Sequence, residues 1–95
     1  MSQLSTVGSV HTTVARDDGI TRVVYHATTV VEFDENVIIL KTGGWFTNTT
    51  KTRMNQTSNQ FGLGYSVYQK DFDWFVNFKG ETIPFVGTMM LLHRN

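Results

Sequence analysis

The sequence predicts a mainly β domain of the α+β type, in which a curled antiparallel sheet or small barrel of about six to seven strands packs with one helix. Apolar and polar residues alternate along most of the chain. Clusters of Asp, Asn and Gly separate the alternating runs, whereas the segment 51–61 lacks alternation and stops at a glycine. A chain of 95 residues has room for a single domain, so we expect 1–95 to fold as one unit with a flexible leader at 1–8.

Strands are expected on the N-terminal side of this helix. The alternating run 9–16 and the turn residues 17–19 predict the first arm and the turn of a hairpin. The run 22–33 is long for one strand, so we expect it to bend or bulge near Ala27. The run 37–42 contains apolar residues on both faces, which is typical of a central or interface strand.

One helix is expected from about Thr50 to Phe61. It follows a cluster of hydroxyl and amide residues suited to helix N-caps, 47–50, and it ends at Gly62. Four strand candidates follow, namely 65–70, 74–78, 81–85 and 88–93. Pro84 has no amide hydrogen, so the third of them is expected to be an edge strand or to be broken at that residue. The side chains predicted to form the core are Tyr25, Val31, Phe33, Ile39, Met54, Phe61, Val67, Trp74 and Val76.

Composition and motifs exclude several classes of function. The chain has no cysteine, which excludes a disulfide scaffold, a thiolate metal site and a thiol nucleophile. The histidines, His11, His26 and His93, show no metal-ligand spacing, and no catalytic motif is present. No apolar run is long enough to span a membrane. We therefore expect no enzyme, no metal, no cofactor and no membrane partner.

The electropositive middle of the chain is the first candidate site. Eight Lys and Arg balance eight Asp and Glu, yet no acidic residue occurs between Asn36 and Lys70. Lys51 and Arg53 fall in the first turn of the predicted helix, where cations are usually unfavourable. They predict a site for an anionic ligand or an acidic partner surface, and reversing both to Glu is then expected to leave folding intact. The alternative is a helix cap with solvated basic residues.

The polar face of the same helix is the second candidate site. Two carboxamide pairs have i, i+4 spacing, Asn55 with Asn59 and Gln56 with Gln60. Carboxamides bind adenine edges and backbone groups, so this row predicts a recognition surface. The alternative is a polar helix face turned to solvent.

Aromatic residues form the third candidate site, and Trp45 and Tyr68 are its binding candidates. Exposed aromatic rings on strands stack nucleic-acid bases in single-strand binding proteins. Such rings also cover the end of a barrel or form a subunit interface, and these two alternatives stay open.

The segments VVYHATTVVEFDENVIIL and TGGWFTNTTKTRMNQTSNQFGLGYSVYQKDFDWFV resemble a family of short tailed-bacteriophage (marine podovirus-like) proteins. The resemblance is most specific in the TGGW, TTKTRMNQ and SNQFGLGYSVYQK blocks. The family has no established activity, so the resemblance implies a phage gene product in an infected bacterium and carries over no catalytic residue.

These observations predict a non-enzymatic phage accessory protein that binds and inhibits or redirects a host protein or defence system during infection. It is expected to act in the cytoplasm of the infected bacterial host, with a host or phage protein as its partner. The alternative is a nucleic-acid or nucleotide-binding module that uses the basic helix start and the carboxamide-rich helix. Assembly into a homo-oligomer is also left open.

Overall fold

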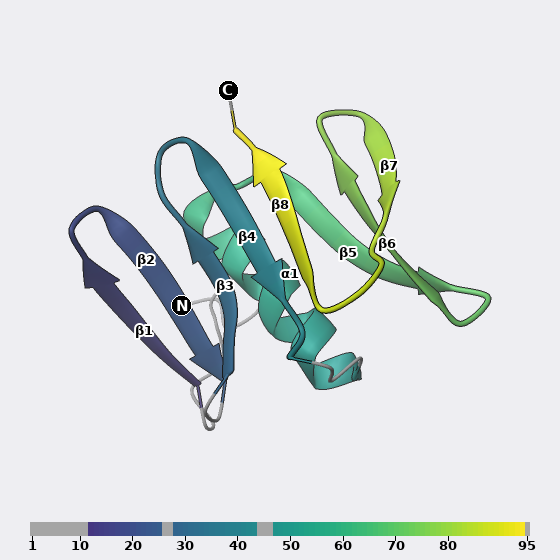
Figure 1. The fold of residues 1–95 in the computed structure, drawn as a ribbon, viewed down its shortest axis with the longest axis horizontal. Coiled ribbons are helices and arrows are strands. Elements are labelled where there is room, and N and C mark those ends of the chain that lie inside the picture. Colours follow the sequence, from purple (N-terminus) through teal and green to yellow (C-terminus); the bar gives the residue numbers. More distant parts are fainter. Residues whose placement is uncertain (1–11, 26–27, 44–46, 95) are drawn as a thin grey trace.

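The computed structural model describes residues 12–25, 28–43 and 47–94. These residues form eight strands and one helix (Figure 1). In chain order the elements are β1 (Thr12–Asp17), β2 (Ile20–Tyr25), β3 (Thr28–Phe33), β4 (Val37–Lys41), α1 (Asn48–Phe61), β5 (Tyr65–Lys70), β6 (Asp73–Phe78), β7 (Glu81–Pro84) and β8 (Met89–His93).

The strands form two antiparallel sheets. The first has the order β1-β2-β3-β4-β8, and the second has the order β5-β6-β7. Figure 1 shows α1 behind the five-stranded sheet, and the helix packs against β5, β3 and β2. The mainly β class with one helix is confirmed. The described strands number eight, more than the expected six to seven, and their two sheets do not close into a barrel.

The run 22–33 forms a hairpin of two strands, so the expectation of one long strand that bends or bulges near Ala27 is wrong. Strands β2 and β3 pair with each other, and Ala27 lies outside the described residues. Val23 pairs with Val31, but the next residue, Val24, pairs with Thr29. Val30 is therefore the extra residue of a β-bulge, which explains why two successive valines of β3 are both buried.

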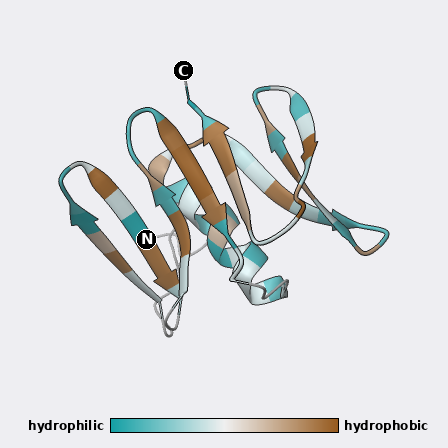
Figure 2. Ribbon diagram, in the orientation of Figure 1, coloured by the Kyte–Doolittle hydropathy of each residue, from teal (hydrophilic) through white to brown (hydrophobic). Residues whose placement is uncertain are grey.

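The strands after the helix match their predicted ranges to within one residue. Pro84 ends β7, and β7 is an edge strand of its sheet, as the missing amide hydrogen predicts. The last strand, β8, pairs with β4, which makes β4 an interior strand of the five-stranded sheet. Figure 2 shows hydrophobic colouring along most of β4, as expected for a strand in this position.

Helix α1 begins two residues before the expected Thr50 and is capped by side-chain chemistry that the sequence indicated. The Thr47 hydroxyl accepts a hydrogen bond from the Thr50 backbone N–H at 3.2 Å. At the other end, Gly62 adopts the left-handed conformation with φ 63°, and its N–H donates to the Ser58 carbonyl. These two caps fix the ends of the helix.

The core lies between the two sheets and the helix. Its buried side chains are Val23, Val30, Val31, Phe33, Ile38, Leu40, Met54, Leu63, Tyr65, Val67, Trp74, Val76, Phe78, Phe85 and Leu92. Six of the predicted core residues are among them, and Tyr25 and Phe61 are partly buried against the same cluster. The prediction for Ile39 is wrong, because Ile38 and Leu40 point into the core and Ile39 therefore lies on the opposite face.

Candidate functional site

Arg53 on α1 is bound to other parts of the fold. Its Nε donates to the Thr12 hydroxyl of β1 at 2.9 Å, and its Nη1 donates to the Gln56 carboxamide at 3.1 Å. Its guanidinium also lies 5.5 Å from the centre of the Tyr25 ring. The side chain therefore links the helix to β1 and β2.

Lys51 precedes Arg53 by two residues on α1 and contacts a different part of the fold. Its ammonium group is 5.9 Å from the centre of the Trp74 ring, and the side chain is half-buried. The two basic residues therefore contact different sheets of the fold. Lys51 packs on the three-stranded sheet, and Arg53 on the five-stranded sheet.

The side chains of Asn55 and Ser58 form hydrogen bonds with the edge of β5 that does not pair with another strand. The Asn55 carboxamide donates to the Val67 carbonyl at 2.9 Å and accepts from the Val67 N–H at 2.7 Å. The Ser58 hydroxyl makes the equivalent pair of hydrogen bonds with the backbone of Tyr65, at 2.6 Å and 3.0 Å. Because β5 is an edge strand, these side chains satisfy backbone groups that a neighbouring strand would otherwise bind.

The other predicted carboxamides lie in different surroundings. Gln56 is half-buried and accepts from Arg53, whereas Asn59 and Gln60 are exposed on the last turn of α1. The four carboxamides therefore do not form one exposed row. One binds a strand edge, one binds an arginine, and two face solvent.

The aromatic candidates are separated from the helix. Tyr68 stacks on Phe75 across the β5–β6 pair, with ring centres 5.6 Å apart. In the same register Phe75 pairs with Pro84, so these three residues form a row across the three-stranded sheet on the face opposite the core. Trp45 lies outside the described residues.

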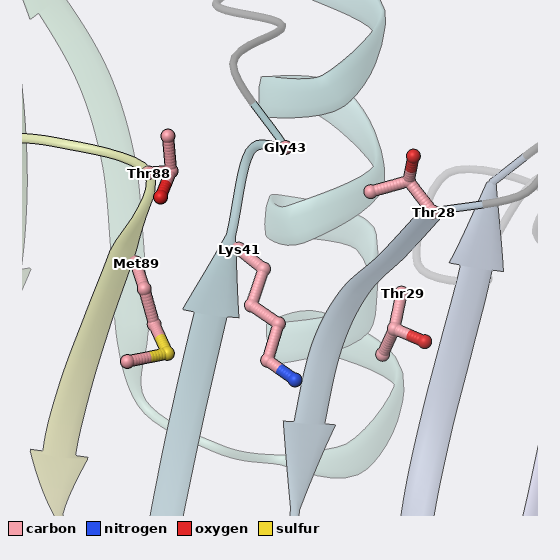
Figure 3. A pocket seen from close by; sticks show the side chains of 6 residues that line it. All are labelled: Thr28, Thr29, Lys41, Gly43, Thr88 and Met89. Atoms are coloured by element: carbon pink, nitrogen blue, oxygen red, sulfur yellow. The ribbon is translucent and has the colours of Figure 1, made fainter.

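A shallow pocket of about 420 Å³ lies at one end of the five-stranded sheet. Its lining residues are Thr28, Thr29, Lys41, Gly43, Thr88 and Met89, and Figure 3 shows the Lys41 side chain reaching across from β4 towards β3. Lys41 and Met89 are cross-strand partners, and they lie on the face opposite the buried Leu40. The Lys41 ammonium is 3.7 Å from the Glu32 carboxylate, so an acid already accompanies the cation of this pocket.

The most exposed apolar side chains are a feature that the sequence reading missed. Phe72, in the turn between β5 and β6, is 94% exposed, and Val86, in the loop between β7 and β8, is 80% exposed. Met89 and Leu91 of β8 are exposed to a smaller extent, 57% and 46%. The strand candidates 65–70 and 74–78 placed Phe72 in the connection between them, but they did not explain why a phenylalanine occupies it.

The described residues contain no group of three or more His, Asp or Glu side chains placed to hold a metal ion. No helix in this part of the chain combines the length and apolarity that a membrane crossing requires.

The fold thus defines a small protein of two open antiparallel sheets joined by one helix. The chain belongs to the Kyanoviridae Gp96 protein family, whose family model matches residues 2–91. This match confirms the resemblance to a family of short phage proteins. The comparisons with curated proteins and with solved structures gave no match.

Proposed function

We propose that this chain is a non-enzymatic phage accessory protein that binds a host protein in the cytoplasm of the infected bacterium and inhibits or redirects it. The observation that carries the proposal is the exposure of Phe72 and Val86, at 94% and 80%. Apolar side chains that lie in solvent are a feature of surfaces that bind other proteins when they gather at one part of a molecule. Phe72 and Val86 both come from the three-stranded sheet or the loop that leaves it.

The nucleic-acid alternative receives less support from the contacts. A binding module at the helix start would need Arg53 and Asn55 to reach a ligand, but both side chains bind the fold itself. The described pocket is lined by Lys41, and an acidic partner lies beside that cation. A phosphate group would have to compete with Glu32 for it.

The test is to express an affinity-tagged chain in host cells during infection, to identify the proteins that it retains, and to titrate each purified protein by calorimetry. We expect one host protein to bind with a defined stoichiometry. The parallel arm titrates single-stranded DNA and RNA oligonucleotides at two salt concentrations. Tight, salt-dependent binding of oligonucleotides, without any retained protein, contradicts the proposal and supports the alternative.

The control for the parallel arm is the Lys51→Glu variant, because the Lys51 ammonium lies over the Trp74 ring, 5.9 Å from its centre. If oligonucleotides bind at the helix start, this variant loses affinity and its salt slope falls by about one. If the protein partner binds through the exposed apolar residues, Lys51→Glu binds it as well as the parent chain does.

A further inference from the structure

Among the described residues, three hairpin turns consist of two residues each, and all six of these turn residues have positive φ. In the β1–β2 turn Asp18 has φ 51° and Gly19 has φ 77°. In the β6–β7 turn Lys79 has φ 52° and Gly80 has φ 77°. The β5–β6 turn has the same conformation with different residues at its second position. There, Asp71 has φ 53° and Phe72 has φ 71°.

Phe72 stands where the other two turns have glycine. Glycine adopts positive φ at little cost, whereas a bulky side chain in this region is an outlier. The residue makes no compensating contribution to the core, because its side chain is 94% exposed. If stability of the fold alone determined the residue at position 72, glycine would be preferred, because the backbone has a positive φ and the phenylalanine ring is exposed to water.

We propose that Phe72 is the anchor by which this chain binds its partner, and that it inserts into an apolar pocket on the surface of another protein. The inference rests on the proposed function and assigns it to one side chain. The β5–β6 hairpin ends at the far right of Figure 1, away from the strands of the five-stranded sheet, so its tip is free to enter a recess. A two-residue turn also gives the backbone of Phe72 a defined conformation, which lowers the backbone entropy lost on binding.

The charged residues next to Phe72 indicate which charges the partner's surface should carry around the pocket. Phe72 lies between two residues with exposed carboxylates, Asp71 and Asp73. One exposed cation, Lys70, is the last residue of β5, directly before the turn. The tip therefore has an excess of negative charge next to its apolar ring. The matching surface is an apolar pocket with basic residues at its rim, whereas an anionic lipid surface would repel the two carboxylates.

The first test compares stability and binding in the Phe72→Gly variant. Glycine gives this turn the same residue type as the other two, so we expect the variant to melt about 4 to 8 °C above the parent chain. The same variant is expected to bind the purified partner at least about 30-fold more weakly, as for a residue that dominates an interface. Val14→Ser, a change at an exposed apolar side chain of β1 in the other sheet, is the matched control and is expected to keep the affinity within about threefold.

The second test places a photocrosslinking benzophenone amino acid at position 72 or, as a control, at position 79 in the neighbouring turn. A discrete adduct with one host protein from position 72, and none from position 79, supports the proposal when the same purified protein fails to bind Phe72→Gly. A variant that melts below the parent chain shows that Phe72 is structural and overturns the proposal.

The remaining outcomes separate this proposal from the proposed function. A host protein that binds Phe72→Gly and the parent chain equally well overturns the anchor and leaves the proposed function intact. If the parent chain retains no protein at all, both fail. Phe72-dependent sedimentation with phosphatidylcholine or phosphatidylglycerol vesicles, or Phe72-dependent self-association in analytical ultracentrifugation, overturns the anchor in favour of a lipid surface or a second copy.

Discussion

Asn55 on the helix and Val67 on β5 are joined by two hydrogen bonds, in which the carboxamide binds both the carbonyl and the N–H of one residue. The side chain therefore occupies the place of a neighbouring strand. Ser58 does the same for Tyr65, two residues earlier on β5. Because side chains of a helix replace a strand here, the three-stranded sheet is attached to the helix along its edge and not only through its apolar face.

Replacing Asn55 with Ala is expected to lower the free energy of unfolding by about 1 to 3 kcal/mol, because the backbone groups of Val67 lose their partner in a partly buried place. Asn55→Asp keeps the acceptor for the Val67 N–H but replaces the donor with a carboxylate oxygen that faces the Val67 carbonyl. It should therefore also destabilise the fold. Urea denaturation followed by circular dichroism measures both changes.

Asn59→Ala is the matched control for Asn55. Asn59 lies on the same helix, is exposed and has a carboxamide of the same size. Its replacement is expected to change stability by no more than about 0.5 kcal/mol. If Asn55→Ala and Asn59→Ala have the same urea midpoint, the contact with Val67 contributes nothing to the fold.

Arg53→Glu is expected to destabilise the fold by about 1 to 3 kcal/mol, because the charge-assisted hydrogen bond to Thr12 and the contact with the Tyr25 ring are both lost. This replaces the expectation that reversing both basic residues leaves folding intact. Arg53→Lys keeps the charge without the planar fork, so it should lose part of the same stability. Thermal melts of the parent chain and both variants measure this, and the melting temperature should fall in the order parent, Arg53→Lys, Arg53→Glu.

Lys51→Glu separates the two basic residues. An acid in the first turn suits the helix dipole, by about 0.3 to 1 kcal/mol, and this offsets the lost contact with the Trp74 ring. We therefore expect Lys51→Glu to melt close to the parent chain. Equal destabilisation by Lys51→Glu and Arg53→Glu contradicts the different contacts of the two residues.

Local chemistry made much of the fold predictable. The helix ends at Gly62 because its left-handed conformation suits a residue without a Cβ, and this can be read from the position of glycine after the polar segment. The turn at 79–80 and the strand end at Pro84 follow from the same kind of reasoning, since each depends on one residue's own backbone preference. The alternation of β6 placed Trp74 and Val76 in the core for a similarly local reason.

The parts that the sequence did not predict depend on which segments meet in space. A helical carboxamide looks the same in the sequence whether it faces solvent or binds a strand edge, so the contact of Asn55 with Val67 could not be foreseen. The run 22–33 alternates in the sequence without a turn signal, so the hairpin was not predicted, and the bulge at Val30 interrupts the spacing of its inward positions. The face of Ile39 was ambiguous since its neighbours are apolar too.

Trp74→Ala is expected to cost about 3 to 5 kcal/mol of stability, as for other large side chains removed from a core. The Trp74 side chain is buried, and its ring meets the Phe85 ring edge-on, with centres 6.2 Å apart. Trp74→Phe retains an aromatic contact and should cost less. Urea denaturation measures the free energy of unfolding of the parent chain and of the two variants. A Trp74→Ala midpoint equal to that of the parent chain would contradict the placement of Trp74 in the core.

The Tyr65 phenol is the group through which we expect stability to depend on alkaline pH. It is buried, and its hydroxyl donates to the Met54 carbonyl. Burial raises the pKa of Tyr65 well above the ordinary phenol value of about 10, because a phenolate would be desolvated there. The folded chain therefore keeps its proton at pH values where the unfolded chain loses it.

The sign of the dependence follows from this difference. Below about pH 10 the phenol is protonated in both the folded and the unfolded state, and the contribution of Tyr65 to stability is fully present. Above about pH 10 only the unfolded state loses this proton, so the free energy of unfolding falls by up to about 1.4 kcal/mol per pH unit. Urea denaturation from pH 8 to 11 measures the slope in the parent chain and in Tyr65→Phe, which has no proton to lose. Tyr65→Phe is expected to be less stable by about 0.5 to 1.5 kcal/mol at neutral pH and to lose stability less steeply above pH 10. Parallel slopes in the two proteins would show that another group controls the alkaline limit.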